Sequence, residues 1–306
     1  MQALPTRRNV VAAQRRIGDQ VHHTPLLTSR TLSKLAGVDV VFKCENLQKS
    51  GSFKYRGALN TVLSLPTRVR RRGVATHSSG NHGAALAAVA QLLGIPATIV
   101  VPRNAVPFKQ AAIRRYGAQI VRCGKTLTSR EKKLAQVLDA TGATYVPPYD
   151  HPGVIAGQGT CALEIVQDQP DVDEIWVPVG GGGMAAGTVL AAGQDVQIVG
   201  AEPTLAGDAR MALQTHQIQP PMAPVTIADG LRTALGQLNF RILDRYQLPI
   251  HLVSEADIVA TQKLVMSCLK VVIEPSSAVP VAALLEHGSW LSDSRRVVVI
   301  ITGGNI

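Results

Sequence analysis

The chain has 306 residues, 46% of them hydrophobic, and a formal net charge of +10 at neutral pH. This length and composition predict a globular, enzyme-sized protein with one large or two ordinary cores. No run of 18 or more apolar residues occurs, and the first 16 residues are polar with four arginines, so neither a membrane span nor a signal peptide is indicated. We therefore expect a cytoplasmic protein without a membrane partner.

The positive charge falls in short groups at residues 68–72, 114–115 and 130–133, and aromatic residues make up only 4% of the chain. Nucleic-acid-binding surfaces commonly place aromatic side chains among their basic residues to stack bases. We expect no nucleic-acid partner, because a basic surface that attracts small carboxylates explains the charge at least as well. The four cysteines are far apart and form no CxxC pair, so no disulfide framework or zinc site is predicted.

Short apolar runs alternate with segments of helical spacing along most of the chain. Strands are predicted at residues 38–44, 73–77, 97–101, 118–121, 144–146, 174–179, 196–201 and 297–301. Helices are predicted at residues 81–93, 107–116, 129–140, 160–167 and 184–192, and a further helix is expected to run on through 58–65. Repeated β-α-β units of this kind predict parallel sheets with helices on both faces, so the fold class is α/β.

Prolines divide this pattern into two parts. Pro66 and the pair Pro147 and Pro148 stand at the two ends of the middle block. We therefore expect residues 66–148 to form a small inserted α/β domain, and residues 1–65 plus 149–306 to form the large domain. In such folds ligands lie beyond the carboxyl ends of the strands and between the lobes.

Lys54 lies where the predicted strand 38–44 gives way to a helix, and Ser52 stands where an N-cap residue is expected. A lysine in the first helical turn faces the positive end of the helix dipole, which lowers the pKa of its amine. A neutral lysine can form a Schiff base with a carbonyl compound and, once displaced, can remove an α-proton. Taken alone, the stretch is more typical of a solvated lysine at a helix start, and only the rest of the chain favours a reactive one.

Two glycine-containing turns predict anion sites. Residues 78–83 (Ser-Ser-Gly-Asn-His-Gly) end a strand and open a helix, where free backbone N–H groups suit a carboxylate or phosphate, although an ordinary capped helix start has the same form. Gly180, Gly181, Gly182 and Gly183 follow the strand 174–179, and four consecutive glycines are costly in chain entropy, which favours a phosphate cradle over a plain loop.

The tetraglycine run also fits a loose dinucleotide pattern through Gly180, Gly182 and Ala185, with Glu202 at a suitable distance to bind a ribose. A dinucleotide-dependent oxidoreductase is therefore a competing hypothesis from another class, as is a non-catalytic ligand-binding α/β protein. The dinucleotide hypothesis leaves Lys54 and residues 78–83 without a role.

Glu202 and Asp208, with the carbonyl of Ala206 between them in sequence, offer the oxygen ligands that Mg²⁺ or Ca²⁺ prefers. Two nearby acids also occur on ordinary surfaces, so the spacing alone leaves both readings open. Thr302, which ends the last predicted strand, could present a hydroxyl to a ring nitrogen or simply close the strand.

Taken together, these segments resemble the fold-type II pyridoxal-phosphate enzymes, within them the serine racemase and serine/threonine dehydratase group, over nearly the whole chain. The matching segments are Ser52-Phe53-Lys54-Tyr55-Arg56-Gly57-Ala58, Ser78-Ser79-Gly80-Asn81-His82-Gly83, Val154-Ile155-Ala156-Gly157-Gln158-Gly159-Thr160, Gly180-Gly181-Gly182-Gly183, Ala228-Asp229-Gly230, Ile273-Glu274-Pro275-Ser276 and Thr302-Gly303-Gly304-Asn305.

The resemblance implies a role for several of these segments. Lys54 would hold pyridoxal 5'-phosphate as an internal aldimine, and the four glycines 180–183 would bind its phosphate. Asn81 would bond the ring hydroxyl, and Phe53 and Gly230 would flank the ring. Thr302 would face the pyridine nitrogen, a position at which the family more often has serine, and a neutral hydroxyl there favours an unprotonated nitrogen. The substrate carboxylate would lie on the turn formed by Ser78, Ser79, Gly80, Asn81 and His82.

Ser79 bears on the subtype. Biosynthetic threonine dehydratases carry alanine at this place, whereas serine racemases carry this serine as the acid/base on the face opposite the lysine, and two-sided proton transfer is what racemisation requires. The related 3-hydroxyaspartate dehydratases also have the serine, so it permits racemisation without proving it. Glu202, Ala206 and Asp208 match the divalent-cation site of racemase-like members, which implies Mg²⁺, or Ca²⁺ or Mn²⁺.

From these residues we expect a pyridoxal-phosphate-dependent lyase that acts on L-serine, L-threonine or a close β-hydroxy analogue, giving keto acid and ammonia, with serine racemase activity as well. The alternatives within the class are a serine racemase proper and a 3-hydroxyaspartate dehydratase. The resemblance also implies a homodimer without a C-terminal regulatory domain. Substrate choice is not readable from the sequence; the turn at residues 150–152 and Arg232 are candidates by residue type only.

Overall fold

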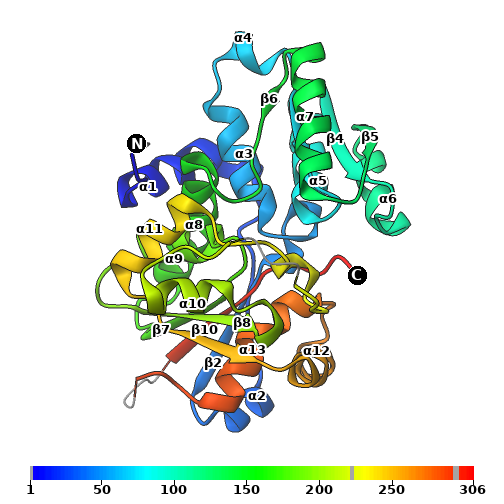
Figure 1. Cartoon of the computed structure of the whole chain (residues 1–306). Coiled ribbons are helices and arrows are strands. Elements are labelled where there is room, and N and C mark those ends of the chain that lie inside the picture. The colour runs from blue at the N-terminus through cyan, green and yellow to red at the C-terminus, as the bar shows by residue number, and fades with distance from the viewer. Residues whose placement is uncertain (1–2, 221–223, 292–295) are drawn as a thin grey trace.

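The computed structural model describes residues 3–220, 224–291 and 296–306, and these form two β-sheets with helices packed around them (Figure 1). The larger sheet has six strands in the order β1-β2-β10-β7-β8-β9. All neighbouring pairs are parallel except β1, which runs antiparallel to β2 at one edge. The strands are β1 (Leu26–Thr28), β2 (Asp39–Cys44), β7 (Glu174–Pro178), β8 (Gln197–Pro203), β9 (Ile250–Val253) and β10 (Arg296–Ile301).

The smaller sheet has four parallel strands in the order β5-β4-β3-β6 and lies at the upper right of Figure 1. Its strands are β3 (Val74–His77), β4 (Ala97–Pro102), β5 (Gln119–Cys123) and β6 (Thr144–Tyr145). The predicted α/β class with parallel sheets is confirmed, and each predicted strand is present within three residues of its expected ends.

The helices cover both sheets, as the alternating pattern predicts. They are α1 (Arg7–Ile17), α2 (Arg30–Ala36), α3 (Lys54–Ser64), α4 (Thr67–Arg70), α5 (Asn81–Leu93), α6 (Pro107–Arg115), α7 (Leu127–Thr141), α8 (Pro152–Asp168), α9 (Gly183–Ala192), α10 (Asp208–Thr215), α11 (Gln237–Tyr246), α12 (Glu255–Leu269) and α13 (Pro275–His287). No helix of the described residues is long and apolar enough to cross a membrane.

Helix α8 begins eight residues before its predicted start at residue 160. Its glycines, which weaken a helix prediction, are needed for close packing. A Cβ atom on Gly157 would lie 2.6 Å from the Cα of Gly57 in α3, and one on Gly159 would lie 2.6 Å from the carbonyl oxygen of Gly187 in α9. The backbone of α8 therefore packs directly against two neighbouring helices, an arrangement that only glycine allows.

The predicted N-cap role of Ser52 is wrong. Helix α3 begins at Lys54, the residue at its cap position is Phe53, and no side chain caps it. Ser52 instead forms an isolated antiparallel bridge with Gly303. This contact joins the start of α3 to the segment that follows β10.

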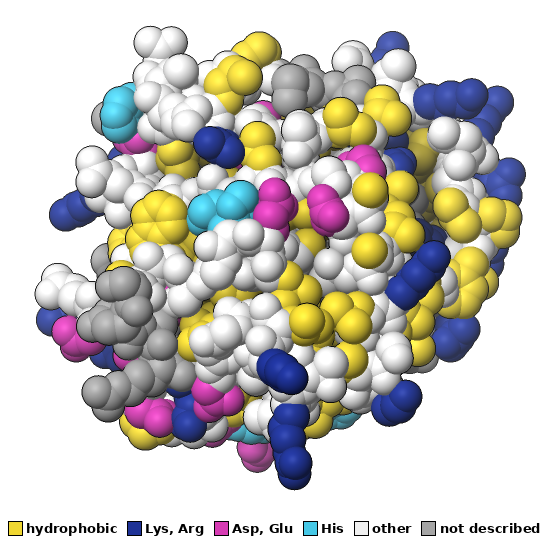
Figure 2. Space-filling model, turned by 90° about the horizontal axis from the view of Figure 1, so that it is seen from below, with side chains coloured by type: hydrophobic (Ala, Val, Ile, Leu, Met, Phe, Trp, Pro, Cys, Tyr) yellow, Lys and Arg dark blue, Asp and Glu magenta, His cyan; other side chains and the backbone are white. Residues whose placement is uncertain are grey.

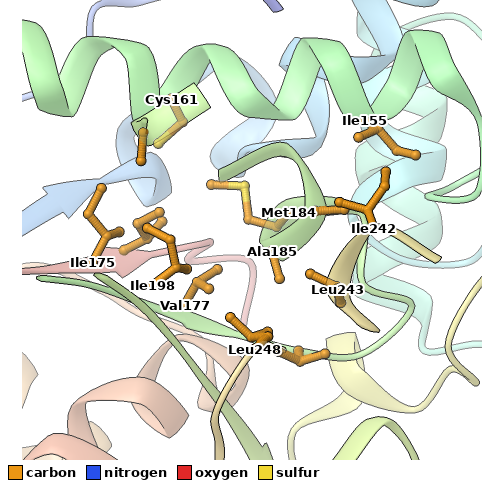
Figure 3. Close-up of a cluster of buried hydrophobic side chains, with 14 of the residues drawn as sticks. Ile155, Cys161, Ile175, Val177, Met184, Ala185, Ile198, Ile242, Leu243 and Leu248 are labelled. Carbon is orange, nitrogen blue, oxygen red and sulfur yellow. The ribbon is translucent and has the colours of Figure 1, made fainter. Parts of the chain in front are cut away.

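One hydrophobic core lies between β7, β8 and the helices α8, α9 and α11 (Figure 3). Ile175 and Val177 of β7 and Ile198 of β8 meet Met184 of α9 and Ile242 of α11, and all five are buried. Burying side chains of this size contributes about 1.5–3 kcal/mol each. This core holds the strand and the helix on either side of the tetraglycine turn.

Helix α3 packs into the core of the smaller sheet, although its first residue lies beside the larger one. Its residues Ala58, Leu59 and Val62 belong to the same buried cluster as Val74 of β3 and Ile99 of β4. We propose that the chain divides into a small domain, residues 66–148, and a large domain, and that both share α3.

A buried ion network fastens α3 to the larger sheet. The fully buried guanidinium of Arg56 donates to Glu45 (Nε to Oε2, 2.8 Å) and to Glu164 of α8 (Nη1 to Oε1, 2.6 Å; Nη2 to Oε2, 2.8 Å). Lys43 of β2 adds a contact of 2.7 Å to Glu164. Burial disfavours ionisation of Glu164, but Arg56 and Lys43 outweigh it and lower the pKa of its carboxyl group.

The surface charges are dispersed. On the face that Figure 2 shows, Lys and Arg side chains stand singly or in small groups between hydrophobic and neutral surface.

Replacing Arg56 by methionine should destabilise the protein by about 3–5 kcal/mol, because Glu45 and Glu164 then stay buried without their main partner. The measurement is urea unfolding at neutral pH. Arg68→Met is the matched control, since Arg68 is exposed on α4, and it should change stability by less than about 0.5 kcal/mol. Equal unfolding midpoints for the two variants would contradict the role assigned to the network.

Candidate active site

Lys54 is the first residue of α3, and its amine is turned toward the segment that follows β6. Its Nζ donates to the carbonyl of Pro148 at 2.9 Å and lies 4.8 Å from the centroid of the Phe53 ring. Burial lowers the pKa of Lys54 to about 8, while the nearby carboxylate of Glu274 opposes the shift. The pKa of Lys54 is lowered, as expected from the sequence, but the main cause of the shift is burial and not the helix dipole. A substantial fraction of this amine is neutral near pH 8.

Asn81, at the start of α5, is held by the carboxylate of Glu274, for which no role is predicted in the sequence analysis. Its Nδ2 donates to both oxygens of Glu274, at 2.8 and 2.9 Å, and its Oδ1 accepts from Nδ2 of Asn305 at 2.8 Å. Glu274 is only 3% exposed, and burial, aided by the charge of Asp229, raises its pKa to about 7 against the opposing hydrogen bond from Asn81. Glu274 lies in a segment that carries the family resemblance, directly before Pro275 at the start of α13, but that resemblance implied no role for its side chain.

Thr302 lies beside the residue that precedes Lys54. Its carbonyl accepts from the amide of Phe53 at 3.0 Å, and its Oγ1 lies 3.1 Å from the hydroxyl of Ser277 in α13. Thr302 is 2% exposed. This backbone pairing brings Thr302 beside the residue that precedes Lys54.

Gly230 lies between α13 and the tetraglycine turn. Its amide donates to the hydroxyl of Ser276 at 3.0 Å, and a Cβ atom on Gly230 would lie 2.8 Å from that oxygen. A Cβ on Gly180 would lie 2.9 Å from the Cα of Leu231, the next residue along. Contacts thus run from Asn81 through Glu274 and α13 to the tetraglycine turn.

The tetraglycine turn connects β7 to α9, and close neighbours explain its composition. A Cβ on Gly181 would lie 2.4 Å from the ring of Tyr149, and Gly182 has a φ of +84°, which disfavours other residues. All four glycines are buried, yet the amides of Gly180, Gly181 and Gly182 donate to no residue that the structure describes. Buried amides normally have partners, so three orphan donors at a helix N-terminus fit a bound phosphate.

The turn at residues 78–82 follows β3 and begins α5. The amides of Ser79, Asn81 and His82 and the hydroxyl of Ser79 have no hydrogen-bond acceptor within the described part of the chain. This set of donors suits a carboxylate. His82 is buried and its Nε2 lies 2.9 Å from the carbonyl of Val146. Burial, followed by the charge of Lys54, lowers the pKa of His82 to about 3, so its ring is neutral.

The acids Glu202 and Asp208 are both buried, and Asp208 bonds the segment that also bonds the tetraglycine turn. Glu202 accepts from the amides of Ala209 (3.2 Å) and Arg210 (2.8 Å), and Asp208 accepts from the amide of Leu235 (2.9 Å). Burial raises the pKa of both, and the charge of Asp208 raises that of Glu202 further.

Two buried carboxylates that repel each other fit a cation between them, and Ala206, in the short 3₁₀ turn Thr204–Ala206, is buried close by in sequence. The described residues contain no group of three or more His, Cys, Asp and Glu side chains placed to hold a metal ion. A cation site here would therefore depend on two carboxylates with carbonyl and water ligands. Because Glu202 is buried against backbone amides, it is also badly placed to bind a ribose.

The residues suggested for substrate choice have structural partners. Arg232 is exposed, and its Nε donates to the carbonyl of Thr226 at 2.6 Å. Asp150 accepts from the amides of Gln237 (3.0 Å) and Leu238 (2.9 Å) and so caps α11. His151 accepts from the amide of Gly153 at the start of α8. These contacts give the turn at residues 150–152 and Arg232 a role in the fold.

The fold and the site together combine two sheets of largely parallel strands with a lysine of lowered pKa and two turns, after β3 and β7, whose backbone amides lack partners among the described residues. A family model described as "Pyridoxal-phosphate dependent enzyme" matches residues 17–303. The chain belongs to this family, and its fold is that of the fold-type II members.

Known proteins match over almost the full chain. A β-hydroxyaspartate dehydratase of Paracoccus denitrificans (strain Pd 1222) is 42% identical over 99% of this chain and 97% of its own length. The structure of maize serine racemase superposes with a TM-score of 0.96 at 38% identity, covering 99% of this chain and 94% of that one. The structure of a serine racemase from Dictyostelium discoideum superposes with a TM-score of 0.95 at 40% identity, and a "T.th." threonine deaminase with a TM-score of 0.93 at 39% identity, each covering 99% of both chains.

The lowered pKa of Lys54 predicts how its amine reacts as pH changes. In the cofactor-free protein, trace labelling with acetic anhydride should rise with a midpoint near pH 8, because only the neutral amine reacts. Peptide mass spectrometry measures the labelling. Nα-acetyl-lysine in the same tube is the control amine, and its labelling should have a midpoint at about pH 10.4. Labelling of Lys54 that follows the control amine would show that burial does not shift its pKa.

Proposed function

We propose that the protein eliminates water from small β-hydroxy amino acids of the L-serine and L-threonine type, giving keto acid and ammonia, and that it also racemises serine. The observation that carries this proposal is the amine of Lys54, whose pKa burial lowers to about 8, together with the two turns whose backbone amides have no partner among the described residues. The relatives named above include a dehydratase, racemases and a deaminase, which supports this class of reaction.

Pyridoxal phosphate, when bound, supplies an electron sink that acidifies the α-C–H bond of an attached amino acid. The residues of this chain would hold it in place. The orphan amides of the tetraglycine turn would bind its phosphate, and Lys54 would hold its aldehyde carbon. Asn81 would contact the ring hydroxyl, Phe53 and Gly230 would flank the ring, and Thr302 would face the ring nitrogen.

Two residues of the site would move protons. Once free, Lys54 would act as the base toward the α-proton, since burial keeps a useful fraction of its amine neutral. Ser79, with its unpartnered hydroxyl, would serve as acid and base on the opposite face, which racemisation requires. The amides of residues 78–82 would hold the substrate carboxylate in place for both.

A serine racemase proper and a 3-hydroxyaspartate dehydratase are second candidates. The 42% identity with a β-hydroxyaspartate dehydratase over nearly the whole of both chains favours the 3-hydroxyaspartate dehydratase. The match to maize serine racemase favours the serine racemase. We further propose a cytoplasmic homodimer, on the basis of the family resemblance.

We also propose that Mg²⁺, or Ca²⁺ or Mn²⁺, binds at Glu202, Asp208 and the carbonyl of Ala206. The mutual repulsion of the two buried carboxylates supports a cation there. The segment that bonds Asp208 also bonds the tetraglycine turn, because the amide of Gly236 donates to the carbonyl of Gly181 at 3.2 Å. A bound cation would therefore stabilise the phosphate-binding turn.

Incubation of the holoenzyme with L-serine, L-threonine and L-threo-3-hydroxyaspartate should yield keto acid and ammonia from serine or threonine, together with D-serine. Keto acid, ammonia and D-serine are assayed in the same samples. D-serine formed faster than pyruvate would show that the protein is a serine racemase proper. Turnover of hydroxyaspartate alone would show that it is a 3-hydroxyaspartate dehydratase.

Lys54→Ala should abolish both turnover and the yellow absorbance that borohydride bleaches in the native protein, because the variant lacks the amine that would hold the cofactor. The spectrum before and after borohydride is the measurement. Lys34→Ala, on the exposed surface of α2, is the control and should keep both properties. A yellow, borohydride-sensitive Lys54→Ala protein would show that another lysine holds the cofactor.

Asp208→Asn should remove the response to divalent cations. In the native protein, Mg²⁺ or Ca²⁺ should raise the melting temperature, because an ion that binds only the folded state stabilises it by mass action. Differential scanning fluorimetry with and without the ion measures the shift, and the exposed Asp195→Asn is the matched control. An unchanged cation response in Asp208→Asn would place the ion elsewhere.

A further inference from the structure

Asn239 is a fully buried side chain to which the proposed reaction gives no role. It lies in the first turn of α11, a helix that packs against α9 through Ile242 and Met184 (Figure 3). Its Nδ2 donates to the carbonyl oxygen of Gly181 at 2.6 Å. The amide of Gly236, directly before α11, donates to the same oxygen at 3.2 Å. The start of α11 therefore holds the tetraglycine turn by one backbone carbonyl.

The peptide unit between Gly181 and Gly182 transmits this contact to the other side of the turn. The described residues contain no cis peptide bond. A trans peptide unit is planar, and its C=O and N–H groups point in opposite directions. Because the carbonyl of Gly181 is held toward α11, the N–H of Gly182 points away from α11. This N–H is one of the three orphan donors of the tetraglycine turn.

Glycines on both sides make this peptide unit easy to turn over. Glycine adopts positive and negative φ about equally readily, and the φ of Gly182 is +84°. A reversed unit would present the carbonyl oxygen of Gly181 on the side where the N–H of Gly182 now lies. That oxygen carries partial negative charge and would repel a phosphate. Donors on the α11 side keep the unit in the orientation that suits an anion.

The surroundings of Asn239 indicate a role beyond packing. Its Oδ1 is buried and has no hydrogen-bond partner among the described residues. Burying a polar atom without a partner costs free energy, whereas a leucine of similar size would fill the space without that cost. The hydrogen bond from Nδ2 to Gly181 therefore explains an asparagine here better than packing does.

We propose that Asn239 is a positioning residue for the phosphate of pyridoxal phosphate. By fixing the carbonyl of Gly181, it directs the N–H of Gly182 toward the phosphate. Asn239 acts through this peptide unit and touches neither the phosphate nor the reacting atoms. The inference rests on the proposed binding of the phosphate at the tetraglycine turn. We expect a moderate effect of removing Nδ2, because the amide of Gly236 still bonds the same carbonyl.

The test compares two ligands that differ only in the phosphate. Cofactor-free native protein and Asn239→Leu are titrated with pyridoxal phosphate and with pyridoxal, and the visible absorbance gives the dissociation constants. Asn239→Leu should weaken the binding of pyridoxal phosphate about three- to tenfold, the usual effect of one hydrogen bond. Its affinity for pyridoxal, which has no phosphate, should be unchanged. Asn239→Ala should give the same pattern and covers the case in which leucine fits poorly.

Gln237→Leu is the matched control, because Gln237 carries an exposed amide side chain in the same turn of α11. It should leave both affinities unchanged. Equal weakening of the two ligands by both Asn239 variants would show that Asn239 serves only the fold, and an unchanged affinity for pyridoxal phosphate would show that it does not orient the turn. Either result would overturn the proposal. The cofactor assignment itself fails only if native protein with pyridoxal phosphate shows no borohydride-sensitive absorbance.

Discussion

The position of Lys54 depends on the buried guanidinium of Arg56, two residues further along the same helix. By binding Glu45, which follows β2, and Glu164 of α8, Arg56 holds the first turn of α3 against the larger sheet. The rest of α3 packs into the core of the smaller sheet. A single helix therefore carries the amine of Lys54 at the junction of the two sheets, and a charge network that is costly to break fixes the start of this helix.

Around this amine the protein places ionisable groups out of water. Burial lowers the pKa of Lys54 to about 8 and that of His82 to about 3, and it raises the pKa of Glu274 to about 7. These shifts all favour the neutral forms of the three groups. The shift of Lys54 brings its amine closer to the neutral form that can remove a proton from carbon.

The tetraglycine turn is connected to two other parts of the molecule. The chain from Leu235 to Asn239 bonds Asp208 on one side and Gly181 on the other, with Nδ2 of Asn239 at 2.6 Å from the carbonyl of Gly181. On the opposite side, Gly180 packs against the backbone beside Gly230. The proposed cation site and the proposed ring-binding residues thus lie against the same short turn, which gives a physical route from cation binding to cofactor binding.

By itself the sequence determined the α/β class and nearly all the strands, because periodicity is a local property of the chain. It also marked Lys54 and the glycine-containing turns at the strand ends as candidates, which stay predictions. It failed where distant backbone contacts decide. Helix α8 starts at Pro152 because its glycines pack against other helices, and Ser52 pairs with Gly303 instead of capping α3. Only the tertiary structure revealed the partners of Asn81 and Thr302, namely Glu274 and Ser277, since residues about 25 to 190 positions apart meet only on folding. It also decided the pKa of Lys54, which burial sets.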